Sequence, residues 1–399
     1  MKELAYLFLK LGIIGFGGPA AHIAMMRNEV VVRKKWMTDE EFLSLVGITN
    51  LIPGPNSTEM AIHIGKVKGN RRGLLIAGLS FILPAVFITL CLAILYVNFG
   101  KLPVVQPFLL GIKPAIIAII FSAVYPLGRS TYKSAALLII GLISLILSFT
   151  GLHELLIMLG AGFCYMIYRL MNGGTVISRK SDIETNIGHS QGKHKTADKD
   201  RGMRGKSKGR KIQMLPLLIT GYAGTTASVG HLFFIFLKIG AILYGSGYVL
   251  FAFLETELVA TGILTRAQLT DAIAVGQMTP GPVFSSVTFI GYILQGWQGA
   301  LFSTIGIFLP SFLFIALLSG FFHRLKSSAV FMDFLTGVIA ASVALIAAVG
   351  ITLGIESITD WRTALIAVAA VAVLFLFKKV NSVFVVLGGA LSGYLLSML

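Results

Sequence analysis

The chain has 399 residues, of which 56% are hydrophobic and only 13% are charged. Soluble domains carry roughly 25% charged residues, so this composition excludes an ordinary soluble protein and predicts a polytopic protein of the lipid bilayer. The two cysteines, Cys91 and Cys164, lie in apolar stretches, so we expect neither a disulfide framework nor a paired-cysteine metal site. The formal net charge of +16 would suit a nucleic-acid-binding protein, but much of it falls in one segment.

Long apolar stretches recur along the chain. They cover residues 74–99, 104–127, 134–150, 154–170, 230–254, 300–322, 329–353, 361–377 and 380–399. Each is near the ~20 residues that a helix needs to cross ~30 Å of hydrocarbon. The first residues do not resemble a cleaved signal, because Lys10 interrupts the apolar run and the same pattern recurs inside the chain. We therefore expect an all-α polytopic membrane protein.

The first part of the chain is repeated in the second. Residues 8–12 (Phe-Leu-Lys-Leu-Gly) return at 236–240 as Phe-Leu-Lys-Ile-Gly, and residues 50–55 (Asn-Leu-Ile-Pro-Gly-Pro) return at 277–282 as Gln-Met-Thr-Pro-Gly-Pro. This echo predicts an internal duplication. We divide the chain into an N-terminal repeat, residues 1–170, a linker, residues 171–229, and a C-terminal repeat, residues 230–399.

The linker is strongly basic. Residues 171–211 hold eleven Lys or Arg against four acidic residues, in a Gly- and Ser-rich stretch without apolar periodicity. We interpret it as a flexible cytoplasmic segment that follows the positive-inside rule, in preference to a nucleic-acid-binding one. Its His189 and His194 are expected to be solvated and not to bind metal.

Charges between the apolar segments predict the topology. Basic residues flank the segment 41–65 on both sides: Arg27, Arg33, Lys34 and Lys35 precede it, and Lys66, Lys68, Arg71 and Arg72 follow it. Both flanks should therefore be cytoplasmic. With Pro53-Gly54-Pro55 at its centre, 41–65 is predicted to form a re-entrant helical hairpin, which is tolerated only where protein or a polar cavity surrounds it.

The corresponding loops of the second half are acidic or uncharged, which predicts that the two halves have inverted topology. The expected fold has about five membrane-spanning helices and one hairpin in each half, with both termini outside. The stretch 212–229 is taken as interfacial, and the number of crossings changes if it spans the membrane.

The broken segments predict an anion site. Pro-Gly-Pro cannot continue a helix, and a helix that begins after it presents free N–H groups and about half a positive charge. Gly17-Gly18-Pro19 and Gly245-Ser246-Gly247 break the first segment of each half in the same way. The predicted substrate-binding residues are Lys10, Gly17, Gly18, Pro19, Asn50, Pro53, Gly54, Pro55, Asn56, Ser57, Thr58, Lys238, Gly245, Ser246, Gly247, Gln277, Thr279, Pro280, Gly281, Pro282, Ser285 and Ser286. The alternative is that Gly and Pro here only permit kinks and close packing.

Charged and titratable residues inside the apolar segments are the next candidates. Lys10 and Lys238 occupy matching positions, where an ammonium costs at least ~2.5–3.5 kcal/mol, so each should be paired, functional or snorkelling to the interface. The candidates for proton coupling are His22, Glu29, Glu59, His63 and Glu257. A metal site at Glu59 and His63 is disfavoured because the second half has Ser286 and Ile290 there, so no cofactor is expected. His22 is expected mainly in a core or interfacial role.

These motifs resemble the chromate ion transporter family in its long, two-domain form. The matching stretches are 8–12, 16–19, 21–23, Trp36 and 53–55 in the first half, and 236–240, 248–250, 257–259, 276–283, 289–292 and 306–310 in the second. The resemblance implies a carrier of the bacterial or archaeal plasma membrane that exports chromate, uses the proton motive force and confers chromate resistance. Two departures leave substrate preference open: residues 245–247 lack the proline of 17–19, and Asn50 stands where many members have Gln.

Other functions stay open at this point. A carrier of sulfate or another oxyanion, in either direction, and a passive anion channel would use the same scaffold. An intramembrane enzyme built on Glu59 and His63 is a third alternative, but no nucleophile-with-base or nucleotide-binding motif is visible, so we expect no enzyme. Whether the chain forms a homodimer is left open.

Overall fold

The computed structural model describes residues 1–16, 18–100, 106–172, 227–244, 247–318, 328–377 and 380–398, and every regular element within these ranges is helical. The first half contains α1 (Lys2–Ile14), α2 (Gly18–Arg27), the π-helix η1 (Asn28–Arg33), α3 (Asp39–Thr49), α4 (Asn56–Phe99), α5 (Gln106–Thr131), α6 (Ala135–Ser148) and α7 (Glu154–Met171). The second half contains α9 (Val229–Ile242), α10 (Val249–Leu254), the π-helix η2 (Glu255–Val259), α11 (Arg266–Met278), the 3₁₀ turn η3 (Val283–Ser285), α12 (Ser286–Leu313), the π-helix η4 (Phe314–Leu318), α14 (Ala329–Ser357), α15 (Trp361–Leu376) and α16 (Ser382–Ser397).

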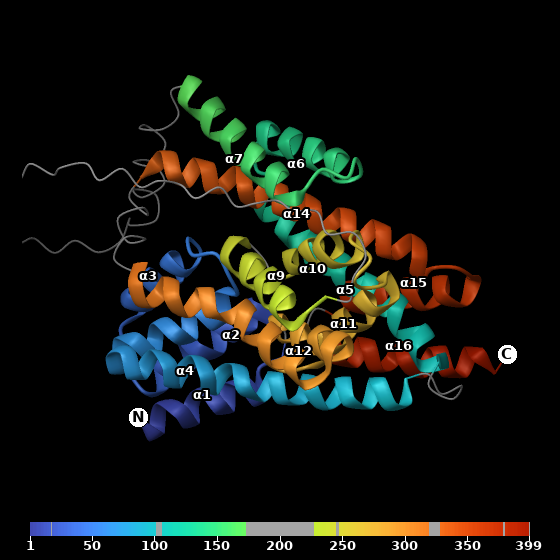
Figure 1. Cartoon of the computed structure of the whole chain (residues 1–399). Coiled ribbons are helices and arrows are strands. Elements are labelled where there is room, and N and C mark those ends of the chain that lie inside the picture. The colour runs from blue at the N-terminus through green and yellow to red at the C-terminus, as the bar shows by residue number, and fades with distance from the viewer. Residues whose placement is uncertain are drawn as a thin grey trace, which may run out of the picture.

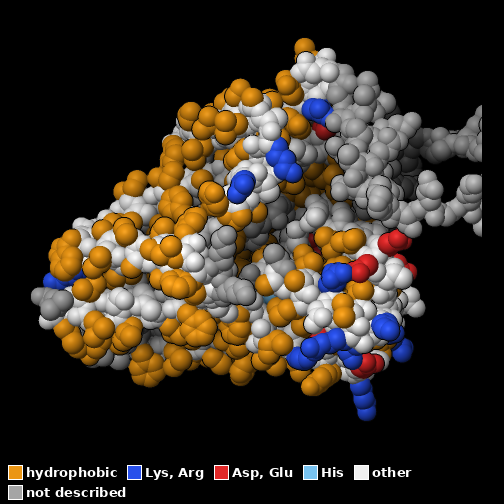
Figure 2. Space-filling view, turned by 180° about the vertical axis from the view of Figure 1, so that it is seen from behind, with side chains coloured by type: hydrophobic (Ala, Val, Ile, Leu, Met, Phe, Trp, Pro, Cys, Tyr) orange, Lys and Arg blue, Asp and Glu red, His pale blue; other side chains and the backbone are white. Residues whose placement is uncertain are grey.

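Five stretches of the described chain are long and apolar enough to cross a membrane: Asn56–Phe99, Gln106–Thr131, Glu154–Met171, Val283–Leu317 and Ala329–Ser357. The helices of the two halves lie interleaved in one bundle (Figure 1), and much of its surface is hydrophobic (Figure 2). Together with the shorter apolar helices α6, α9, α15 and α16, these stretches confirm the predicted all-α polytopic class.

Two of the long elements are helical hairpins. The turn in α4 lies at Gly69 and Asn70, which divides it into α4a (residues 56–68) and α4b (residues 71–99). The turn in α12 has nearly the same backbone angles at Gln295 and Gly296, which divides it into α12a (residues 286–294) and α12b (residues 297–313). Asn70 has φ 53° and Gly296 has φ 59°, a left-handed conformation that Asn and Gly adopt most readily.

The first helices return to the end from which they start. Lys34 Nζ lies 2.6 Å from Glu3 Oε1, and the side chain of Met1 reaches Gly69, so the N-terminus, the end of η1 and the turn of α4 share one end of the bundle. The prediction that the first apolar segment crosses the membrane before it reaches Arg27 is therefore wrong. The prediction that both termini lie on the same side is also wrong, since they lie at opposite ends of the bundle (Figure 1). The reason is the break after Ile14, which lets α2 run back beside the start of α1.

The next segment behaves similarly. Arg27 pairs with Asp39 at the start of α3, and Lys68 at the end of α4a lies over the ring of Trp36. Residues 39–68 thus leave this end and come back to it around Pro53-Gly54-Pro55. Re-entry of this hairpin from the cytoplasmic side stays a prediction.

The expected span 230–254 is also interrupted. Helix α9 ends at Ile242 and α10 begins at Val249, while Gly245 and Ser246 lie outside the described residues. Gly17 and linker residues 173–226, which include His189, His194 and the stretch 212–226, also lie outside the described residues.

The same small-residue contacts recur in both halves. A Cβ on Gly12 of α1 would lie 2.6 Å from the carbonyl oxygen of Phe81 in α4, and one on Gly240 of α9 would lie 2.3 Å from that of Ile307 in α12. The later helices cross over: α5 packs on α16 through Gly111, and α14 packs on α7 through Gly337. Close approach at small residues is the usual way in which membrane helices associate, because lipid offers no hydrophobic drive between them.

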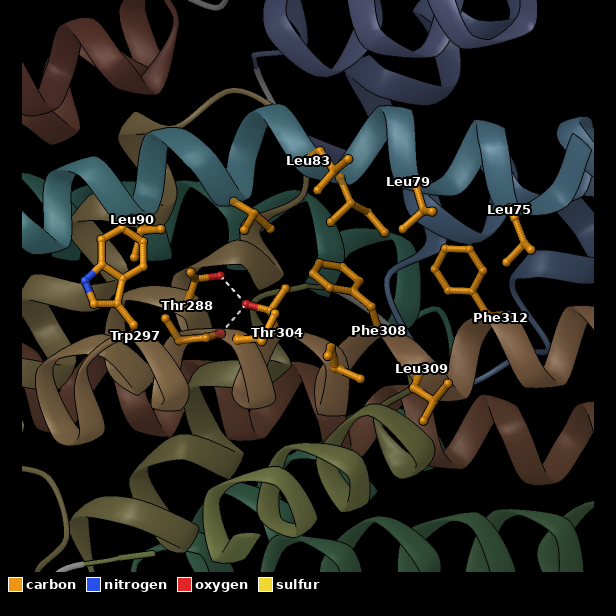
Figure 3. A pocket seen from close by; sticks show the side chains of 15 residues that line it. Leu75, Leu79, Leu83, Leu90, Thr288, Trp297, Thr304, Phe308, Leu309 and Phe312 are labelled. Atoms are coloured by element: carbon orange, nitrogen blue, oxygen red, sulfur yellow. Dashed lines mark hydrogen bonds between the residues drawn. The ribbon is translucent and has the colours of Figure 1, made fainter. Parts of the chain in front are cut away.

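The equivalent helices α4b and α12b lie side by side and run in opposite directions. Leu75 near the start of α4b lies beside Phe312 near the end of α12b, whereas Leu90 lies near Trp297 at the start of α12b (Figure 3). A Cβ on Gly78 would also meet the ring of Phe312. Antiparallel equivalent helices are the arrangement expected of inverted repeats.

This arrangement predicts opposite exposure of the two hairpin turns. With Cys91 and Cys164 replaced by Ser, we expect Lys68→Cys to react with an impermeant maleimide only from the cytoplasm and Gln295→Cys only from outside. Each turn ends a helix pair at one end of the antiparallel bundle, so no single side can reach both. Labelling of both cysteines in intact cells, or of neither, would contradict the inverted arrangement.

Candidate functional site

The first Pro-Gly-Pro turn joins α3 to α4 and is held by the second half of the chain. Gly54 has φ +135°, and its N–H donates to the carbonyl oxygen of Leu243, just after α9, at 2.8 Å. A Cβ on Gly54 would lie 2.5 Å from both Glu59 Oε1 and Ser311 Oγ. Only glycine therefore fits here, both in conformation and in space.

The second turn is held in the same way by the first half. Gly281 has φ +93°, and its N–H donates to the carbonyl oxygen of Gly15, just after α1, at 2.8 Å. A Cβ on Gly281 would lie 3.0 Å from the Cβ of Ala85. Ala85 follows Leu83-Pro84 as Ser311 follows Leu309-Pro310, so the two turns make equivalent contacts across the halves. The sequence predicts both turns but not this exchange.

Because the N–H groups of Gly54 and Gly281 are bonded, any open backbone donors must lie in the first turn of the helix that follows each glycine. The N–H groups of Thr58 and Glu59 turn back to the carbonyl oxygen of Pro55. The open N–H groups of the α4 start are therefore those of Asn56 and Ser57, which have no acceptor within hydrogen-bond distance in the described chain. The Asn56 amide donates to Asn50 Oδ1 at 2.9 Å, so these two predicted residues meet.

Several side chains beside the turns are buried with polar atoms that have no partner among the described residues. They are Thr58 Oγ1, Glu59 Oε2, His63 Nδ1, Gln277 Nε2 and Ser286 Oγ. Thr58, Glu59 and Ser286 are fully buried. Buried polar atoms nearly always have a protein or water partner, so a group of them at two helix starts indicates a place for a polar ligand or water.

The second turn carries a neutral polar cluster. Thr89 of α4b is fully buried, and its hydroxyl lies 3.2 Å from Ser285 Oγ and 3.4 Å from Thr279 Oγ1. Thr89 was not among the predicted residues. A Thr in the middle of the apolar stretch 74–99 was the signal available, because buried hydroxyls within a span need a partner.

The first turn instead carries a single carboxyl group. Glu59 accepts a hydrogen bond from Ser311 Oγ at 3.3 Å and is fully buried. His63 follows one helical turn later and is also buried, and Tyr244 at the end of α9 lies within electrostatic reach of Glu59. Within the described residues no group of three or more His, Cys, Asp and Glu is placed to hold a metal ion. Ser311 and Tyr244 were missed, because they come from the other half.

His22 and the two lysines have defined partners. His22 Nε2 lies 2.8 Å from the carbonyl oxygen of Gly15, the same oxygen that receives the N–H of Gly281, which agrees with its expected role in the core. Lys10 lies 3.1 Å from Glu29, and Lys238 pairs with Glu257 in the equivalent place. Each ammonium is thus neutralised by the matching glutamate of its own half.

Both glutamates of these pairs sit on π-helices. Glu29 belongs to η1 and also pairs with Arg33 at 3.0 Å, while Glu257 belongs to η2 and lies 3.0 Å from His153 Nε2. A widened helix at the same place in two repeats is unusual, since π-helices are rare and often occur at functional sites. Of the remaining predicted residues, Gly18 has φ +78° and open space around its Cα, and Gly247 faces Phe284.

Comparison with known proteins agrees with the two-repeat architecture. A family model described as chromate transporter matches residues 2–166 and again residues 230–394. The chromate transport protein of Cupriavidus metallidurans is 31% identical over 401 residues, covering 98% of this chain and 92% of that protein. The probable chromate transport protein of Synechococcus elongatus is 27% identical over 399 residues, covering 98% and 95%.

An uncharacterized transporter of Bacillus subtilis is 31% identical over 160 residues, which cover 39% of this chain but 78% of that protein. No solved structure matches. Since the family model accounts for both halves and leaves out the segment between them, the chain belongs to the chromate transporter family.

Proposed function

We propose that this protein is a secondary carrier that exports chromate, a tetrahedral oxyanion, from the cytoplasm across the plasma membrane of a bacterium or archaeon. Export is driven by the proton motive force and gives chromate resistance. Residues 1–170 and 230–399 are the two carrier halves, and 171–229 is a cytoplasmic linker. The observation that carries the proposal is the pair of Pro-Gly-Pro turns, each bonded to the other half of the chain, with donors beside them that have no partner among the described residues.

The anion would be held mainly by neutral groups. The N–H groups of Asn56 and Ser57, the hydroxyls of Thr58 and Ser286 and the amide of Gln277 are the donors available. A helix start adds about half a positive charge, and hydrogen bonds to a charged acceptor contribute more than those between neutral groups. Such a site favours a small oxyanion, and the names of the relatives point to chromate.

Glu59 is the candidate for proton coupling. Its carboxyl group is fully buried, its second oxygen has no partner, and no Lys or Arg lies within 4 Å of it in the described chain. An ionised carboxylate in such surroundings is very unfavourable, so Glu59 is buried in its neutral form and must release the proton when the carrier opens it to water. This cycle links proton movement to the state of the neighbouring helix start.

Transport into everted membrane vesicles tests the function and the coupling together. We expect the parent protein to accumulate chromate inside the vesicles when respiration makes their interior acidic. The variant Glu59→Gln, which mimics the neutral acid, should move chromate only down its own concentration gradient, losing at least about tenfold of the driven accumulation. The exposed Glu40→Gln serves as the matched control.

Three results would decide against parts of this proposal. Chromate flux that does not depend on the proton gradient in the parent protein indicates a passive anion channel. Accumulation of sulfate in place of chromate indicates a carrier of another oxyanion. Full gradient dependence in Glu59→Gln would remove this residue from the coupling while leaving the carrier function intact.

The glycines of the two turns should be essential. We expect Gly54→Ala and Gly281→Ala each to abolish export, since a left-handed residue with a Cβ costs ~1–2 kcal/mol and the new Cβ meets the other half of the chain. Chromate resistance at equal membrane abundance is the measurement. Gly262→Ala is the control, because Gly262 also has positive φ but nothing within 4 Å.

A second variant separates strain from contact. Ala85→Gly removes the atom that a Cβ on Gly281 would meet, so Gly281→Ala/Ala85→Gly should recover only the part of the loss that is due to crowding. Normal resistance in Gly54→Ala would mean that the first turn takes no part in the site.

The lysines should draw the anion through their charge. Among the described residues, Lys238→Met leaves Glu257 with His153 as its remaining basic partner, whereas Lys10→Met leaves Glu29 with Arg33, so we expect the Lys238 variant to be more severe. We expect each substitution to weaken chromate binding by roughly tenfold. The loss should be smaller than the loss on breaking a fully buried ion pair, because both lysines are about a third exposed. Lys238→Arg should retain part of the binding. Restoration by Lys238→Met/Glu257→Gln would show that the pair is structural.

A further inference from the structure

The groove between α4b and α12b is a separate cavity of about 640 Å³ (Figure 3). Its walls are leucines of α4b and the rings of Trp297, Phe308 and Phe312 on α12b. The two hydroxyls in the wall are satisfied, since Thr288 and Thr304 are 2.7 Å apart and Thr304 also donates to the carbonyl oxygen of Ala300. The groove therefore offers no free hydroxyl for an ion, which separates it from the anion site and suits an apolar ligand.

The groove opens sideways onto the lipid-facing surface. Its rim is made of half-exposed side chains, with Leu79 at 47%, Leu83 at 54% and Leu301 at 57%. Both helices of the groove belong to stretches long and apolar enough to cross the membrane, so the opening meets the acyl chains of the bilayer. Its volume lies within the ~300–1,000 Å³ of ordinary ligand sites.

One end of the groove is basic. Arg71 lies four residues before Leu75, and Leu79 and Leu83 follow at the same spacing, so Arg71 caps the ridge that lines the groove. No acidic side chain lies within 4 Å of Arg71 or Arg72 in the described chain. Two basic residues of the nearby N-terminal helices, Arg27 and Lys34, do have acidic partners.

Arg27 pairs with Asp39, and Lys34 pairs with Glu3. The opposite end of the groove has Trp297 directly after the turn at Gln295 and Gly296, where tryptophans commonly mark the other membrane interface. The groove thus has a cationic end with no acidic partner among the described residues, an apolar trough and an aromatic end, which is the polarity of a membrane lipid.

We propose that this groove binds an acyl chain of an anionic phospholipid whose headgroup lies against Arg71 and Arg72. Basic side chains beside grooves between membrane helices are known to select anionic headgroups, and each contributes enough attraction to change affinity several-fold. The lipid would fill the seam between the two halves at their antiparallel contact. Its binding requires no assumption about the transported ion.

Native mass spectrometry of the purified full-length protein tests this, with phosphatidylglycerol and phosphatidylcholine of identical acyl chains as probes. We expect at least about tenfold tighter binding of phosphatidylglycerol. Arg71→Gln/Arg72→Gln should lose that preference, whereas Arg129→Gln/Lys133→Gln, which removes equal charge from the end of α5, should keep it. Leu79→Trp fills the trough from a half-exposed position and should weaken both lipids.

Two outcomes would overturn the proposal. One is equal affinity of the parent for both lipids, or an unchanged preference in Arg71→Gln/Arg72→Gln. The other is efficient disulfide formation by Leu79→Cys between two chains in vesicles, in a background with Cys91 and Cys164 replaced by Ser, which would show that a second copy of the chain occupies the groove.

Discussion

The structure depends on one reciprocal exchange of backbone hydrogen bonds. Gly54 of the first half donates to Leu243 of the second, and Gly281 of the second donates to Gly15 of the first. Inside a bilayer, a backbone group outside a helix has no water to bond, so without the other half each Pro-Gly-Pro turn would leave the N–H of its glycine unpaired. Each half supplies what the other lacks. A half on its own has no acceptor for its turn, and the duplication therefore has a physical use beyond symmetry.

The exchange also explains why the two half-sites can differ. The backbone scaffold is the same in both, but the first turn has Glu59 with Ser311 where the second turn has Ser286 with Ala85. The neutral cluster of Thr89, Thr279 and Ser285 stands at the other turn. A duplicated scaffold that binds an ion through backbone and hydroxyl donors needs only one titratable group to link that ion to a proton. Glu59 has the burial for this role, and no counterpart stands at the equivalent position.

The sequence predicted the features that depend on neighbouring residues, and it missed those that depend on contacts between residues far apart in the chain. The two Pro-Gly-Pro turns, the break before Pro19 and the all-α class follow from local chemistry. The match of Lys10 with Lys238 and of Glu29 with Glu257 was visible as a repeat, and the structure joins each Lys to its Glu. The partners of the turns could not be read in this way. Ser311 and Leu243 lie far along the chain from Gly54, and only the packing of the halves brings them together.

The wrong assignment of the N-terminal segment has a different cause. Basic residues after a segment of suitable length fit a crossing helix, but they fit equally well a segment that returns after a glycine break. The ion pair of Glu3 with Lys34 decides between the two, and no local pattern could have supplied it. The π-helices η1 and η2 were likewise invisible, because their insertion changes the helical period without a marker residue.

The distribution of charge sets a limit on selectivity. Both lysines that could have met an anion directly are already bound to glutamates, and no Lys or Arg lies within 4 Å of the carboxyl of Glu59 in the described chain. A dianion at the turns would therefore be bonded directly by helix ends, hydroxyls and an amide, whose geometry is adaptable, while the lysines would act on it through their charge without direct contact. Such donors recognise charge and size better than they recognise the central atom of a tetrahedral oxyanion. Discrimination between chromate and sulfate would then depend on the shape of the site around these donors, and not on the donors themselves.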